Sequence, residues 1–153
     1  LLANARVDRN RVDQNGYTAL MWAAKEGNVG VVTQLLADHL VDPNITGQYG
    51  NTALMWAAIE GHAEVVRRLL ANDSVEPNIA NQNGITALMF AAVRGKPTVV
   101  SLLLADDRVE INITNQDGET ALVAAANACH GEVAQLLLER ERRGYLRLLY
   151  GKK

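Results

Sequence analysis

The chain has 153 residues, is 48% hydrophobic and only 5% aromatic, and carries a formal net charge of −2, which suits one compact domain or one short array of repeats. No apolar run approaches the length of about 18 residues that a membrane-spanning helix needs, and a single cysteine excludes an internal disulfide framework. The last fifteen residues hold six Lys and Arg against two Glu, so a short basic end follows an acidic body; this argues against nucleic-acid binding along the body.

A repeat of 34 residues runs through the chain. Threonine, glycine and asparagine each recur at that spacing: Thr18, Thr52, Thr86, Thr120; Gly16, Gly50, Gly84, Gly118; and Asn10, Asn44, Asn78, Asn112. The recurring segments read GYTALMWAAKEG, GNTALMWAAIEG, GITALMFAAVRG and GETALVAAANAC. A period of this size indicates a solenoid of stacked units, but the spacing alone also fits helical-hairpin repeats of the tetratricopeptide type.

Each unit predicts two short helices and an extended loop. The first helix begins at the threonine, whose hydroxyl satisfies an unpaired amide, and ends near Gly27, Gly61 and Gly95. The second helix carries an apolar stripe, as in Val31, Val32, Leu35 and Leu36. The loop that follows reads V-[D/E]-x-N, with Asn-Gly or Asp-Gly turns at its tip in three of the four units.

These residues resemble the ankyrin repeat family, whose pattern places a turn glycine before T-P-L-H-x-A-A, then Gly, V-V-x-x-L-L and a loop Asn. The resemblance covers about residues 1–138 and implies an all-α solenoid of helix-turn-helix units with projecting β-hairpin-like loops. The family's Pro and His are replaced here, for example by Ala19 and Met21, so we expect methionine packing in place of the histidine's hydrogen bond. Gly47 replaces an acidic or amide residue, which predicts a looser loop. Cys129 replaces a helix-ending glycine, which predicts a helix end that is either strained or differently shaped.

The repeat register divides the chain into six segments. They are the end of a truncated preceding repeat, four ankyrin repeats, and a basic C-terminal tail or cap: residues 1–11, 12–45, 46–79, 80–113, 114–143 and 144–153. Leu1–Asn4 align with Leu69–Asn72, which suggests a piece of a longer array with an open N-terminal face. The basic end has three interpretations: a solvated cap, a contact for an anionic partner or membrane, or a linker.

No catalytic constellation, metal site or cofactor site is predicted. His62 and His130 occupy the same register of different repeats, which stacking holds apart, and Cys129 next to His130 lacks the spatial opposition that a nucleophile and its base require. The chain has no CxxC, HExxH, phosphate-binding glycine loop or calcium loop. We therefore interpret it as a non-enzyme, and the single cysteine agrees with a cytoplasmic location, with the nucleus also open.

Positions that differ between the four units predict where a protein partner docks. In ankyrin-like arrays these positions line the concave face and the finger tips; the alternative is neutral drift on solvated positions. The predicted partner-binding residues are Tyr17, Lys25, Tyr49, Asn51, Ile59, Glu60, Ile85, Val93 and Arg94. Trp22, Trp56 and Phe90 form a second ladder, interpreted either as packing between adjacent first helices or as a partly exposed aromatic stripe in the groove.

The leading hypothesis is thus a protein-binding module or scaffold of unknown partner, with no nucleic acid and no transmembrane span. The alternative is a structural or regulatory spacer array within a larger protein, or an array that self-associates through its exposed repeat ends. An enzyme is the third class, and it would need a convergent polar pocket that a one-dimensional stack seldom makes.

Overall fold

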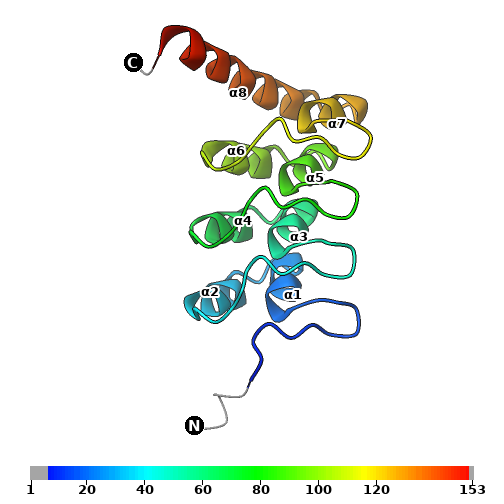
Figure 1. The fold of residues 1–153 in the computed structure, drawn as a ribbon, viewed down its shortest axis with the longest axis vertical. Helices are drawn as coiled ribbons and strands as arrows, with labels where there is room; N and C mark the ends of the chain where they lie inside the picture. The colour runs from blue at the N-terminus through cyan, green and yellow to red at the C-terminus, as the bar shows by residue number, and fades with distance from the viewer. Residues whose placement is uncertain (1–6, 152–153) are drawn as a thin grey trace.

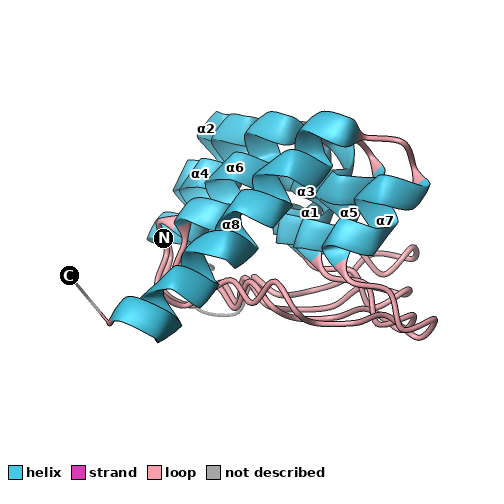
Figure 2. Ribbon diagram, turned by 90° about the horizontal axis from the view of Figure 1, so that it is seen from above, coloured by secondary structure: helices cyan, strands magenta, loops and turns pink. Residues whose placement is uncertain are grey.

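The computed structural model describes residues 7–151, which form a stack of helix pairs (Figure 1). There are eight helices and no strand within this range: α1 (Ala19–Lys25), α2 (Val29–Ala37), α3 (Ala53–Glu60), α4 (Ala63–Leu70), α5 (Ala87–Val93), α6 (Pro97–Ala105), α7 (Ala121–Asn127) and α8 (Gly131–Tyr150). Figure 2 shows the first helices (α1, α3, α5, α7) as one layer, the second helices as another, and the loops projecting from one side. The predicted all-α solenoid is confirmed.

The first helices begin as the sequence predicts. The hydroxyl of each cap threonine accepts a hydrogen bond from the amide three residues later, as Thr52 Oγ1 does from Met55 at 3.3 Å. Thr18, Thr86 and Thr120 repeat this bond. Because each first helix spans only seven or eight residues, a satisfied first turn is a large share of its backbone bonding.

The first helices also end as predicted, in the left-handed backbone conformation. Gly27 has φ 72°, Gly61 has φ 81° and Gly95 has φ 61°. Cys129 holds the same place in the fourth unit with φ 60°, and it is the only non-glycine residue with positive φ in the described chain. The predicted strain at Cys129 is therefore present, since a Cβ in this conformation crowds the neighbouring carbonyl oxygen.

Cys129→Gly is expected to raise the free energy of unfolding by about 1 kcal/mol, because glycine removes the cost of a side chain at positive φ while adding some unfolded-state entropy. Urea denaturation followed by circular dichroism measures the change. Cys129→Ala is the matched control, because it removes the thiol and keeps the Cβ. An equal gain from alanine would show that the thiol, not the backbone conformation, limits stability.

The core is a column of small and branched side chains between the two helical layers. Val65, Val66 and Leu69 of α4 are fully buried, and the alanines of the first helices let neighbouring backbones approach closely. The predicted methionine packing is confirmed, because Met21, Met55 and Met89 are 1 to 3% exposed. Helices in substantial contact belong to the same pair or to adjacent pairs, as expected of a one-dimensional stack.

The return loops are joined by a ladder of asparagine side chains. Asn78 donates from Nδ2 to the carbonyl of Arg108 at 2.7 Å and accepts at Oδ1 from the amide of Glu110 at 2.9 Å. Asn10 and Asn44 make the same two bonds to the loop that follows theirs. Each asparagine thus fixes the register between one repeat and the next.

Arg108 adds a further clamp to the third return loop. Its guanidinium donates to the carbonyls of Leu70 at 2.7 Å and Val75 at 3.0 Å, and to a carboxylate oxygen of Asp106 at 2.7 Å. This bond from Arg108 is the largest influence that lowers the pKa of Asp106. The side chain therefore ties the third return loop to the end of α4.

Helix α8 differs from the expected division at residues 143 and 144. The helix continues without a break through Gly144 to Tyr150, so residues 144–150 are part of α8, and the division of the chain into six segments stays a prediction. Good helix-forming residues on both sides offset the cost of about 1 kcal/mol for a glycine inside a helix. The prediction for Leu1–Asn4, and the last two lysines of the predicted tail, lie outside the described residues.

Candidate partner-binding surface

Each repeat projects a hairpin-like finger, which we number by repeat: residues 13–17, 47–51, 81–85 and 115–119. The first residue of each finger donates its amide to the carbonyl of the fifth, as Asn81 does to Ile85 at 3.0 Å. In fingers 1, 3 and 4 the side chain of that first residue accepts two more amides, as Asp13 Oδ1 does from Asn15 and Tyr17. The fingers are therefore ordered by local bonds that do not depend on a partner.

Finger 2 lacks the two side-chain bonds because it begins with Gly47. It still keeps its backbone bonds, from the Gly47 amide to the Asn51 carbonyl at 3.0 Å and from the Gly50 amide to the Gly47 carbonyl at 2.9 Å. A Cβ at residue 47 would lie 2.8 Å from the carbonyl oxygen of Gly16. Glycine thus allows fingers 1 and 2 to approach closely, while the expected loosening of finger 2 stays a prediction.

Glutamines tie fingers 2, 3 and 4 together. Gln82 Nε2 donates to the carbonyl of Gln48 at 3.0 Å, and Gln116 Nε2 donates to the carbonyl of Gln82 at 2.6 Å. Fingers 2, 3 and 4 consequently form a continuous frame. The exposed residues of α1, α3, α5 and α7 together with the finger tips form what we call the inner surface.

An aromatic cluster lies on the inner surface of repeats 1 and 2. The ring of Tyr17 is 4.8 Å from the ring of Trp22 and 5.2 Å from that of Trp56. The ammonium group of Lys25 lies 5.0 to 5.4 Å from the centroids of all three rings, within reach of cation–π attraction. The four side chains come from finger 1, α1 and α3, so the cluster also joins two repeats.

Asp13 anchors the exposed edge of this cluster. The indole N–H of Trp22 donates to Asp13 Oδ2 at 2.8 Å, which links α1 to finger 1. The amide of Tyr17, and after it this indole bond, hold the pKa of Asp13 below its usual range. Asp13 therefore stays ionised at neutral pH and keeps Trp22, which is 38% exposed, in one orientation.

The predicted binding residues of the first helices lie at the helix ends that face the same side. Glu60, Val93 and Arg94 are exposed, and Tyr49 at the tip of finger 2 is 61% exposed. Ile59 is only half-buried, as are Trp56 and Phe90, so the aromatic ladder both packs between helices and reaches the surface. Both interpretations of that ladder therefore describe part of it.

Two of the predicted partner-binding residues are less exposed than expected. Asn51 is buried, at 7% exposure, and its Oδ1 accepts a hydrogen bond from Asn81 Nδ2 at 2.9 Å. Ile85 is half-buried and packs against the core. The prediction of an exposed finger residue is therefore wrong for Asn51, whereas Ile85 keeps part of its side chain at the surface.

Histidines fix the ends of two first helices, a feature that sequence reasoning did not foresee. His62 Nε2 donates to the carbonyl of Lys25 and His130 Nε2 to that of Val93, both at 2.9 Å. Both carbonyls belong to predicted binding residues. The signal in the sequence was the shared 34-residue register of this position, which Lys96 occupies in the third repeat. The repeat that follows thus helps to position the surface of the repeat before it.

The family model for ankyrin repeats, built as three copies, matches residues 1–79 and 73–145. The chain belongs to the ankyrin repeat family. No curated protein matches it. Ankyrin repeats are generally modules for protein–protein interaction and are typically non-enzymatic. The resemblance inferred from the repeat residues is therefore confirmed.

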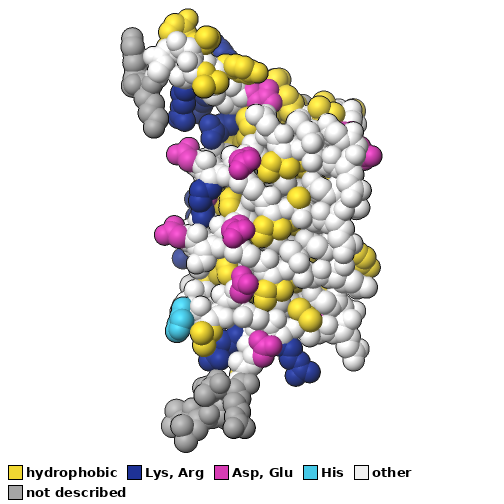
Figure 3. Space-filling model, viewed as in Figure 1, with side chains coloured by type: hydrophobic (Ala, Val, Ile, Leu, Met, Phe, Trp, Pro, Cys, Tyr) yellow, Lys and Arg dark blue, Asp and Glu magenta, His cyan; other side chains and the backbone are white. Residues whose placement is uncertain are grey.

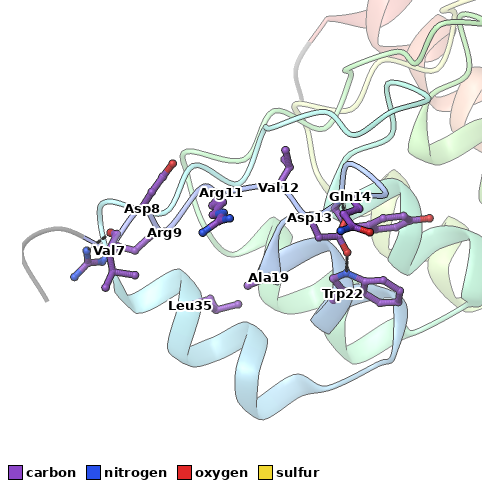
Figure 4. A pocket seen from close by; sticks show the side chains of 11 residues that line it. Val7, Asp8, Arg9, Arg11, Val12, Asp13, Gln14, Ala19, Trp22 and Leu35 are labelled. Carbon is purple, nitrogen blue, oxygen red and sulfur yellow. Dashed lines mark hydrogen bonds between the residues drawn. The ribbon is translucent and has the colours of Figure 1, made fainter. Parts of the chain in front are cut away.

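The face of the first ankyrin repeat that points away from the second is hollowed, with a volume of about 840 Å³ (Figure 4). Leu35 and Ala19 line it together with the indole of Trp22. Ala19 is exposed here, whereas the equivalent Ala53 is 1% exposed because repeat 1 covers it. The hollow is thus the apolar stacking face of a repeat, with no described residue over it.

The opposite side of the ankyrin array, formed by the return loops, is more charged. Asp42, Glu76 and Glu110 are exposed at equivalent positions, and Figure 3 shows acidic side chains recurring along the stack on this side. Residues 7–151 contain no group of three or more metal-ligating side chains. None of the described helices is long and apolar enough to span a membrane.

Proposed function

We propose that this ankyrin array binds a protein partner at its inner surface, centred on the aromatic cluster and on Tyr49 of finger 2. The observation that carries the proposal is the partly exposed Trp22, which Asp13 holds in place within the aromatic cluster. Large aromatic groups held in one orientation give contact area at little entropic cost, which is typical of the centre of an interface. Tyr17, Tyr49 and Trp56 also line a common small hollow between fingers 1 and 2.

The other predicted residues surround this centre on the same surface. Glu60, Val93 and Arg94 continue it along the ends of α3 and α5, while Ile59 and Ile85 contribute the exposed parts of half-buried side chains. Lys25 supplies positive charge, but its ammonium is already attracted to three rings. Lys25 therefore acts first by orienting the rings and only then by contact with a partner.

A comparison of three baits tests this proposal. The first bait is the unchanged chain, the second carries Tyr49→Ala, Val93→Ala and Arg94→Ala, and the third carries Asp42→Ala, Glu76→Ala and Glu110→Ala. All six residues are exposed, so thermal midpoints are expected to stay within a few degrees. Proteins recovered from a lysate of source cells are identified by mass spectrometry, and the affinity of the purified partner is then measured by calorimetry.

We expect the inner-surface variant to bind at least thirtyfold more weakly than the unchanged chain, because truncation of a central tyrosine costs about 2 kcal/mol or more. The return-loop variant is expected to bind as the unchanged chain does. A partner that is lost only by the return-loop variant would move the site to that side and overturn the proposal. Cytoplasmic location, which the exposed free Cys129 suits, stays a prediction for microscopy of a tagged chain.

A further inference from the structure

Helix α8 exposes an apolar stripe along its length, and its C-terminal end also exposes Leu146, Leu148 and Tyr150. Leu138, Tyr145 and Leu149 are 52%, 67% and 73% exposed, and Arg142 lies between them at the helical spacing of four, three and four residues. Val133 and Leu137 on the other side are buried against the array. Figure 1 shows α8 extending past α6, and Figure 3 shows hydrophobic side chains gathered on its far end. Such a stripe is unusual for a surface that only meets water.

The spacing of the stripe is that of a seam between two paired helices. Apolar positions alternating by three and four residues stay on one side of a helix along a partner. A parallel pair of two copies would set Arg142 against Arg142, which like charge disfavours. In an antiparallel pair centred between residues 143 and 144, Leu138 meets Leu149 of the second copy and Arg142 meets Tyr145 of the second copy. This arrangement packs leucine on leucine and places a guanidinium on an aromatic ring.

The charges beside the seam complement each other in the same arrangement. Arg143 pairs with Glu139 at 2.6 Å, and Arg140 with Asp107 at 3.8 Å, within one chain. Glu141 and Arg142 form no ion pair with any residue between 7 and 151. Because Glu141 lies one turn from Tyr145, the antiparallel pair brings Arg142 of each copy beside Glu141 of the other.

These observations favour a second copy over a lipid surface as the occupant. A helix that lies on a membrane carries unpaired Lys and Arg along its apolar stripe, whereas here Arg143 is paired with Glu139 and Arg142 is adjacent to Glu141. We propose that two copies of this chain associate through the outer stripe of α8, as an antiparallel helix pair centred between residues 143 and 144. The inner surface lies on other elements, so this association is independent of the proposed partner binding.

Sedimentation equilibrium of the 153-residue chain between about 1 and 200 µM tests the association. The seam covers only about three turns, at the low end of interface sizes, so the dimer is expected to be weak, with a dissociation constant of tens of micromolar. Leu149→Glu is expected to raise that constant at least tenfold. Leu40→Glu, at a residue that is 53% exposed outside α8, is the matched control and is expected to leave it unchanged.

Two further variants test the antiparallel register. Arg142→Glu is expected to weaken the dimer, and adding Glu141→Arg to it is expected to restore at least half of the loss. In a Cys129→Ser background, a short thiol cross-linker should join Leu138→Cys chains to Leu149→Cys chains in a mixture, and should not join Leu138→Cys chains to one another. Circular dichroism checks that each variant is folded.

A chain that is monomeric throughout this range would overturn the proposal. So would a dimer that is insensitive to Leu149→Glu, which would point instead to the hollow at the first repeat. Equal cross-linking of Leu138→Cys chains among themselves would refute the antiparallel register. Binding of the monomer to phosphatidylserine vesicles with no dimer in solution would assign the stripe to a membrane.

Discussion

Leu69→Ala is expected to lower the free energy of unfolding by about 3 kcal/mol, the usual cost of a fully buried leucine that leaves a cavity. Leu69 lies on α4 between two neighbouring repeats and is completely inaccessible to solvent. Few side chains surround the cavity that alanine would leave, because each repeat contacts only the repeat before and the repeat after it. The surrounding structure can therefore fill the cavity only in part. The change is measured by urea denaturation at 25 °C.

Leu35→Ala is the matched control at the same register of the first repeat. Leu35 is only half-buried, because it lines the hollow that no described residue covers. Its truncation is expected to cost about 1 kcal/mol, as the loss of partial burial without a closed cavity. Equal effects of the two variants would show that something closes the hollow in solution.

Asn78→Ala is expected to lower the free energy of unfolding by about 2 kcal/mol, because two inter-repeat hydrogen bonds are lost together. Removing the amide group leaves both the carbonyl of Arg108 and the amide of Glu110 without their bond to Asn78. Thermal and urea denaturation measure the change. Hydrogen exchange at the Glu110 amide is expected to accelerate in the variant, which locates the loss at the return loop.

Asn112→Ala is the control for this ladder. Asn112 holds the same register in the fourth repeat, but it is exposed and its side chain makes no hydrogen bond to any described residue. Its substitution is expected to change stability by less than about 0.5 kcal/mol. A large effect at Asn112 would mean that the helical propensity or solvation of this loop, and not the ladder, explains the cost at Asn78.

The repeating parts of the fold could be predicted because each follows from a local rule. A threonine hydroxyl can satisfy an amide three residues later, and glycine is favoured at positive φ, without any knowledge of the rest of the chain. The same rule identified Cys129 as a strained substitute, which its φ of 60° confirms. Local chemistry thus set the boundaries of the first helix in each of the four repeats.

The features that could not be predicted from the sequence depend on side-chain contacts between neighbouring repeats. Tyr17 and Trp56 come together only because adjacent repeats stack in one register, and no local pattern says which rings will touch. Asn51 looked like a finger residue open to partners, yet a neighbouring finger covers it and Asn81 bonds to it. Side-chain exposure was therefore the least predictable property, although most of the predicted residues lie on the inner surface.

Arg108 and α8 were missed for a different reason, since both depart from the repeat. Leu40, Ser74 and Arg108 share one register, so the repeat gives no sign that Arg108 bonds to the preceding return loop. The continuation of α8 past Gly144 has no counterpart in the other repeats, where the second helix ends earlier. A comparison of repeats within one chain thus identifies the residues that all repeats share. It does not identify contacts made by a residue that occurs in one repeat.

The asparagine and glutamine ladders have a consequence for how such a chain changes length. Every ladder bond joins residues 30 to 34 positions apart, so each joint is specified wholly by two neighbouring units. If one 34-residue unit were duplicated or deleted, the units on either side of the change would still present the asparagine and glutamine residues that make the ladder bonds. The gene can therefore gain or lose a unit in a single event without compensating substitutions in the core. The length of the array can vary while its architecture stays the same.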